Sequence, residues 1–331
     1  MTSPPPLPRG SLPGVGKLAV QLLLTILVTW VIVSRVGVSL DDLRSPGLSV
    51  DGLRMGWVAI SCVVLFLAMG IAARLWGLMV RELGGKDPGM AGSFRIVLTA
   101  NLARYIPGKL WQIAGLAVLS RRADIPATLG AGAGLLTQVF HLAGAAAVGI
   151  LVLGPRGTGL APGVGAWAAL SVLLVIVGAA STPPLLRWGF RTAFRFTGVD
   201  AVEIPRVGVF FGPKWVGLHT LSWLVYGAAF AALVRGLGVE APGQVGMVAA
   251  FSAAYLVGYV ALFAPAGIGV REGVLIALLQ PFAGAAAVGI ALLARVWMTL
   301  VELLPAAAMA LWEIFRDRGR PERLETRGED G

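Results

Sequence analysis

The stretch Ala264-Pro-Ala-Gly-Ile-Gly-Val-Arg-Glu-Gly273 interrupts a long apolar segment at 245–280. Proline removes a backbone donor and clashes with the preceding helical turn, and glycine adds conformational freedom. An apolar helix therefore ends near Pro265, and a short helix begins after Gly267 and Gly269. The segment predicts a broken helix at membrane depth, which is tolerated only where protein surrounds it or where it lines a wet cavity.

A second apolar segment, at 91–120, is interrupted by Asn101-Leu-Ala-Arg-Tyr-Ile-Pro-Gly-Lys-Leu-Trp-Gln112. Here Pro107 and Gly108 predict that one helix stops near Ile106 and another starts near Gly108. In both places a short helix and then a long apolar helix follow the break. We interpret this recurrence as a weak internal repeat.

Composition sets the class of protein. Of 331 residues, 57% are apolar and only 13% are charged, against ~25% charged in an average soluble domain. The chain is therefore a membrane protein, and its net charge of +10 lies in short loops between apolar runs, which does not favour nucleic acid as a partner. One cysteine, Cys62, and two histidines, His141 and His219, exclude a disulfide framework and a zinc site, so we expect neither metal nor cofactor.

Apolar runs of about 20 residues predict an all-α integral membrane protein with about six full transmembrane helices and two re-entrant broken-helix hairpins, at about 91–120 and 245–280. The six runs are 18–34, 55–73, 126–154, 164–182, 215–234 and 282–315. We expect a polytopic membrane domain at 17–315, with a disordered tail at 1–16 and a charged tail at 316–331.

Lysine and arginine predict the orientation, because short cytoplasmic loops are enriched in them. If the N-terminus is inside and both hairpins enter and leave on one side, 18 of the 27 lie in the cytoplasm and 5 lie outside. The first hairpin then enters from the cytoplasm and the second from outside, so the repeat is inverted. We expect a plasma-membrane protein with both termini in the cytoplasm.

Transporters built from inverted repeats place their binding site where broken helices meet near the midplane. The start of each short helix favours an anion, because its backbone N–H groups are unpaired and the positive end of the helix dipole lies there. Arg104, Lys109 and Arg271 add positive charge at the breaks. A bound anionic head group is therefore predicted, with phosphate as the simplest candidate. The candidate head-group residues are Arg104, Lys109, Arg271, Glu272, Asn101 and Gln112, and the helix breaks are Pro107, Gly108, Pro265, Gly267 and Gly269.

The intramembrane charges have a structural alternative. Arg271 and Glu272 could pair with Arg295 and Glu302 to lock the helix bundle. Arg295 and Glu302 are seven residues apart, so they share one face of a helix and form a candidate intramembrane charge pair. Glu272 or Glu302 could also hold the cations of an empty site or recognise an amine.

Four polar residues carry a weaker signal. Asn101 and Gln112 could line the cavity or cap the broken helix ends. His141, in an apolar run, is more often a satisfied buried histidine than a proton carrier. His219 is near the end of a predicted span, and no role is assigned to it.

At the two breaks the chain resembles the transmembrane region of bacterial lysylphosphatidylglycerol synthases, which also occurs in many stand-alone membrane proteins. The resemblance rests on Asn101…Tyr105-Ile-Pro-Gly-Lys109, on Pro265-Ala-Gly-Ile-Gly-Val-Arg-Glu-Gly273 and on the span layout from about Lys17 to Phe315. It implies an inverted-repeat bundle with re-entrant helices. In the synthases this flippase-like region is tied to moving aminoacylated phospholipid between leaflets, and related stand-alone proteins are associated with polyprenyl-phosphate-linked sugars.

No residues remain after Arg316 for the soluble aminoacyl-transfer domain of the synthases, so we do not expect an enzyme. The leading hypothesis is a lipid translocator or lipid-binding protein for an anionic lipid, such as a phospholipid or a polyprenyl-phosphate conjugate. One alternative is a non-catalytic accessory subunit whose partner is a membrane glycosyltransferase. An intramembrane lipid-modifying enzyme is less favoured, because the sequence near the breaks has no nucleophile–base pair, metal cluster or carboxylate cluster.

Overall fold

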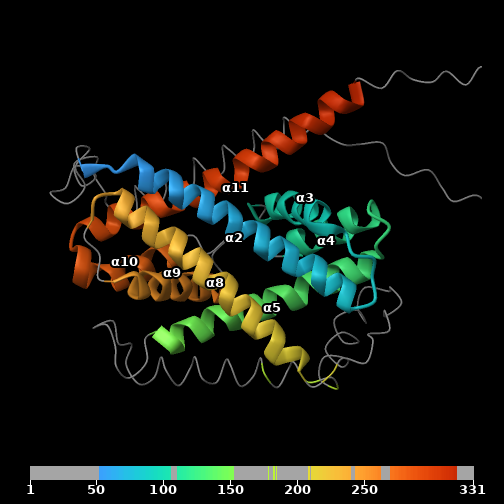
Figure 1. The fold of residues 1–331 in the computed structure, drawn as a ribbon, viewed down its shortest axis with the longest axis horizontal. Coiled ribbons are helices and arrows are strands. Elements are labelled where there is room, and N and C mark those ends of the chain that lie inside the picture. Colours follow the sequence, from blue (N-terminus) through green and yellow to red (C-terminus); the bar gives the residue numbers. More distant parts are fainter. Residues whose placement is uncertain are drawn as a thin grey trace, which may run out of the picture.

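The computed structural model describes residues 52–105, 110–152, 178, 182, 184, 208, 210–239, 243–261 and 269–318. This part of the chain contains eight α-helices, one short 3-10 helix and no strand (Figure 1). The α-helices are α2 (Met55–Glu82), α3 (Gly89–Asn101), α4 (Leu110–Arg121), α5 (Ala127–Val152), α8 (Phe211–Gly236), α9 (Gln244–Val260), α10 (Val270–Ala283) and α11 (Ala286–Arg318).

Four of these helices, α2, α5, α8 and α11, are long and apolar enough to cross a membrane. They coincide with the spans predicted at 55–73, 126–154, 215–234 and 282–315, and the described part of this multi-pass membrane protein is all-helical. The predicted spans at 18–34 and 164–182, the tail at 1–16 and the tail beyond residue 318 lie outside the described residues.

Helix α8 is the central helix of the described bundle. Buried residues occur along its whole length, and it packs against α2, α5 and α9. Figure 1 shows α2 and α8 crossing the bundle, while the C-terminal part of α11 extends beyond the other helices. The core has two clusters of buried apolar side chains: one joins α2, α5 and α8 to α9, α10 and α11, and the other joins α2, α5 and α8 to α3 and α4.

Close backbone approach holds α5 against α8. A Cβ atom added at Gly144 would lie 2.7 Å from the carbonyl carbon of His219 and 2.8 Å from the backbone nitrogen of Thr220. Gly227 of α8 faces α9 in the same way, because a Cβ atom added there would lie 2.6 Å from the Cα of Val248. Small residues permit such contacts in membranes, where dispersion rather than the hydrophobic effect drives helix packing.

Both predicted breaks are present as interruptions between helices. At the first, α3 ends at Asn101, a 3-10 turn runs from Leu102 to Tyr105, and α4 begins at Leu110. At the second, α9 ends at Val260 and α10 begins after Gly269, whose φ of 81° lies in the left-handed region that glycine tolerates. α4 packs against α3 and α5, and α10 packs against α9 and α11, so the order of a helix, a break, a short helix and a long helix occurs twice.

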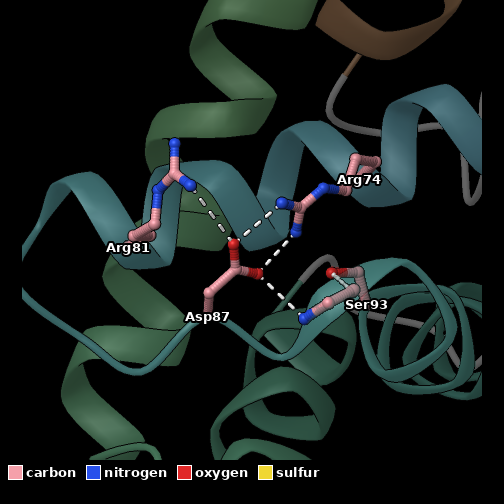
Figure 2. Close-up of polar contacts among 5 residues, drawn as sticks. Arg74, Arg81, Asp87 and Ser93 are labelled. Carbon is pink, nitrogen blue, oxygen red and sulfur yellow. Dashed lines mark hydrogen bonds and ion pairs between the residues drawn. The ribbon is translucent and has the colours of Figure 1, made fainter.

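A charged clamp closes the turn between α2 and α3 (Figure 2). Arg74 donates to both carboxylate oxygens of Asp87, at 2.5 and 2.8 Å, and the backbone N–H of Gly89 donates to Asp87 Oδ1 at 2.8 Å. Arg81 lies 3.6 Å from the same carboxylate. The hydrogen bond from Arg74 is the main cause that lowers the pKa of Asp87 from 3.8 to about 2.

Other ion pairs gather at the same end of α2. Lys214, at the start of α8, donates to Glu82 Oε1 at 2.6 Å, and Lys86 lies 3.6 Å from Asp124. These side chains are partly or largely exposed, in contrast to the buried apolar middle of the helices. This end of the bundle therefore has the charged character of a membrane–water interface.

Candidate functional site

A cavity of about 90 Å³ lies among seven helices, α2, α3, α4, α5, α8, α9 and α11. Its lining residues occupy the middle of α2, α5, α8 and α9 and lie where the two core clusters meet. The lining is unusually polar for the centre of a membrane bundle. Its polar and aromatic members are Asn101, Gln112, Thr137, Gln138, His141, His219, Trp76, Trp223, Tyr226, Phe251, Tyr255 and Glu302.

His219 is the most isolated polar group of this wall. It is 0% exposed, and within the described structure neither ring nitrogen has a hydrogen-bond partner. Its ring contacts that of His141 edge-on, with 5.5 Å between the ring centroids. The side-chain nitrogen of Gln138 and the hydroxyl of Thr137 are likewise buried without a partner among the described residues. Unsatisfied buried polar groups are rare and costly, so these atoms are unusual features of the wall around the cavity.

Aromatic rings fix the position of His141. Its imidazole stacks on Trp223 at 4.6 Å, with Tyr255 at 5.5 Å and Tyr226 at 5.9 Å. Trp223 Nε1 donates to the backbone carbonyl of His141 at 2.7 Å, which ties α8 to α5. His141 is partly buried and engaged by these ring contacts, as expected for a packed histidine, and the proton-carrier alternative stays untested.

Asn101 and Gln112 flank the first break and line the cavity. Gln112 Nε2 donates to Asn101 Oδ1 at 2.7 Å, so the two amides join the end of α3 to the start of α4. Both residues therefore have the lining position that was one of the two roles predicted for them, and the capping role stays a prediction.

Arg271, on the first turn of α10, lies directly behind the cavity wall. Its guanidinium carbon is 4.8 Å from the ring centroid of Phe251 and 5.4 Å from that of Tyr255, and its Nη1 is 3.1 Å from the sulfur of Met298. All three contacted side chains line the cavity. A cation is thus stacked on the aromatic rings that line the cavity.

Glu272 is engaged in two internal contacts. Its Oε2 accepts a hydrogen bond from the backbone N–H of Gly269 at 2.7 Å, which satisfies the N-cap residue at the start of α10. Its Oε1 lies 3.2 Å from Nη1 of Arg295 on α11, and the two side chains are 4% and 12% exposed. The recorded ion pair of Arg295 is therefore with Glu272, while Glu302, 1% exposed, lines the cavity.

The remaining predicted site residues lie at or beyond the edge of the description. Lys109, Pro107, Gly108, Pro265 and Gly267 are outside the described residues, and Arg104 is described only through its backbone in the 3-10 turn. Their part in a head-group site, and the proximity of the two break tips, stay predictions.

Sequence reasoning passed over His219, Tyr226 and Tyr255. A signal was available on α8, where Trp215, His219, Trp223 and Tyr226 recur every three or four residues and so share one helix face. The sequence predicts that His219 lies near the end of a span, but α8 starts at Phe211, which places the histidine more than two turns inside the helix.

The family comparison agrees with this architecture. The family model described as the lysylphosphatidylglycerol synthase TM region matches residues 18–306. The chain belongs to this family. The match supports a membrane protein related to lipid handling and covers both breaks, all eight described helices except the end of α11, and every residue that lines the cavity. No curated protein and no solved structure matches the chain.

For a member of the lysylphosphatidylglycerol synthase TM-region family, the cavity offers several kinds of binding group. Imidazole, amide, hydroxyl and carboxylate groups lie around one polar space, and Arg271 is stacked behind its wall. Among the described residues, no group of three histidine, cysteine, aspartate or glutamate side chains could hold a metal ion.

Proposed function

We propose that this protein binds a phosphate-bearing membrane lipid and moves its head group between leaflets without changing it chemically. The observation that carries the proposal is the polar cavity in the middle of an apolar helix bundle. Moving a polar lipid head group through hydrocarbon costs much free energy. A polar cavity between helices provides the polar partners that hydrocarbon lacks.

Arg271 supplies the charge in this proposal. Its guanidinium suits a phosphate through its planar fork, and it sits at the second helix break beside the cavity wall. Arg104 and Lys109 would provide the matching charge at the first break. We further propose a plasma-membrane location with both termini in the cytoplasm, and membrane lipids as the partners.

The test uses the purified full chain with phosphatidic acid as the probe, because its head group is a phosphate alone. In Arg271→Gln, loss of one charge-assisted contact of ~1.5–3 kcal/mol should weaken binding roughly tenfold to hundredfold. The melting temperature should stay close to that of the unaltered protein, since the removed cation also carried an insertion cost.

Arg235→Gln provides a matched control. The Arg235 guanidinium also stacks on an aromatic ring, 5.1 Å from Trp57, but it lies at the end of α8 and does not line the cavity. This change should leave phosphatidic acid binding unaltered. A collapsed melting temperature in Arg271→Gln, or an equal loss of binding in both variants, would contradict the role given to Arg271.

A further inference from the structure

Two aromatic rings lie between the Arg271 guanidinium and the cavity. The guanidinium carbon is 4.8 Å from the ring centroid of Phe251 and 5.4 Å from that of Tyr255. Both rings line the cavity, whereas Arg271 is not among the described residues that line it. A phosphate in the cavity would therefore meet a ring before it met the cation. A ring or the arginine has to move before a charge-assisted contact can form.

The backbone that carries Arg271 is held in place. A Cβ atom added at Gly258 of α9 would lie 2.8 Å from the Cβ and 3.3 Å from the Cα of Arg271, so α9 and α10 are in close contact at this point. The next residue, Glu272, is bound to the N–H of Gly269 and to Arg295 on α11. A shift of the first turn of α10 would break these contacts, so a ring side chain is the part that moves at least cost.

Of the two rings, that of Phe251 is packed more tightly. The residue is 0% exposed, its ring stacks on Phe230 at 4.8 Å, and it meets Trp297 edge-on at 6.3 Å. Protein interiors packed in this way leave few voids into which a ring could turn. Phe251 is therefore a fixed part of the wall.

Tyr255 has more freedom, because it is only partly buried and lies at the edge of the cavity. Its ring meets Trp223 edge-on at 4.9 Å and His141 edge-on at 5.5 Å, and both of these residues also line the cavity. The adjoining space of about 90 Å³ gives the Tyr255 side chain room for a second rotamer. A group that enters this space would also contact the ring directly.

We propose that Tyr255 is a gate that covers Arg271 and swings aside when the phosphate of a lipid head group enters the cavity. This inference rests on the proposed function, because the gate has a role only if Arg271 binds that phosphate. The tyrosine ring and the phosphate then compete for the same cation. The apparent affinity for the lipid is lowered in proportion to the fraction of protein in which the gate is closed.

The test measures binding of phosphatidic acid to the full chain in nanodiscs. Tyr255→Leu removes the ring and keeps the position apolar, so binding should tighten about threefold to thirtyfold, the range that a cation–π contact spans. Tyr255→Phe keeps the ring and should bind like the unaltered protein. In an Arg271→Gln background, Tyr255→Leu should have no effect, because no cation remains to be uncovered.

Trp57→Leu is the matched control. The Trp57 ring also stacks on an arginine, 5.1 Å from the guanidinium carbon of Arg235, but it does not line the cavity. Its loss should leave phosphatidic acid binding unchanged. If Tyr255→Leu does not fold, phenylalanines with increasing numbers of fluorine atoms at position 255 replace it. They weaken the cation–π contact with little change of shape, so the affinity should rise with each added fluorine.

The outcomes separate the gate from the proposed function. Weaker binding in Tyr255→Leu, or a gain that persists in the Arg271→Gln background, would overturn the gate. If Arg271→Gln weakens binding while Tyr255→Leu and fluorination leave it unaltered, the phosphate site stands and the gate falls. If phosphatidic acid does not bind at all, or if Arg271→Gln alone leaves binding unchanged, the proposed function is itself wrong.

Discussion

Glu272 on α10 and Arg295 on α11 form an ion pair at 3.2 Å, and both side chains are almost entirely buried. The same carboxylate accepts the N–H of Gly269, so it fixes the start of α10 and joins α10 to α11 at once. This is the locking role that the sequence offered as one of two readings of these charges.

Breaking this pair should destabilise the protein. Arg295→Gln leaves the Glu272 carboxylate buried without its cation, at a cost of ~3–5 kcal/mol, which thermal unfolding in detergent would show as a large drop in melting temperature. Adding Glu272→Gln removes the stranded charge and should restore much of that loss. The exposed pair Lys86–Asp124 is the control, since Asp124→Asn should have little effect. Equal effects at the two pairs would contradict a locking role.

Stability at acid pH should depend on Asp87. Its folded-state pKa is about 2 against a usual 3.8, so its stabilising effect is complete above about pH 4 and disappears as the pH falls toward 2. Asp87→Asn should lower stability at neutral pH and flatten the profile between pH 4 and pH 2. The measurement is chemical unfolding at a series of pH values, and an unchanged acid limb in the variant would refute this assignment.

Gly144→Ala should separate α5 from α8. The new methyl group would lie within 3 Å of the backbone of His219 and Thr220, and such overpacking costs ~1–3 kcal/mol. Because His141 and His219 lie on these two helices, lipid binding should weaken along with stability. Gly217→Ala on α8 is the matched change, because no atom lies within 4 Å of its Cβ position. It should leave binding intact and leave stability unchanged or up to ~1 kcal/mol higher through helix propensity.

The proposed orientation can be tested at the two ends of α2. In a Cys62→Ser background, a single cysteine replacing Arg54, just before the helix, should react with a membrane-impermeant thiol reagent added outside intact cells. One replacing Lys86, just beyond the 28-residue helix, should be shielded until the cells are opened. The opposite labelling pattern would invert the topology. Ser120 is a poor reporter of sidedness, because its side chain is fully buried and would be shielded on either side.

Hydropathy and helix-breaking residues were enough to predict the four spans and both breaks, because span length and the chemistry of proline and glycine act locally. The predicted span at 55–73 is too short, because the corresponding helix, α2, continues to Glu82. Hydropathy falls at Arg74 and Arg81, but the helix persists since Asp87 satisfies these cations.

The spacing of charged residues in the sequence could not predict which side chains they contact in the structure. Arg271 and Glu272 are adjacent in sequence, yet one packs on Phe251 while the other pairs with Arg295. Neighbouring residues on a helix point about 100° apart, so their surroundings depend on which helices pack on each side. The sequence could not predict the isolation of His219 either, because that isolation results from the packing of α5 against α8.

The Glu272 carboxylate at the start of α10 also changes what an anion would find there. The start of α10 already holds the Glu272 carboxylate. A phosphate could bind there only after that carboxylate had left the N–H of Gly269 and the guanidinium of Arg295. The displaced Glu272 carboxylate would lose both partners, so this exchange opposes the binding of an anion at the start of α10. The start of α10 is thus satisfied by its own side chain, and an anion gains little by binding there.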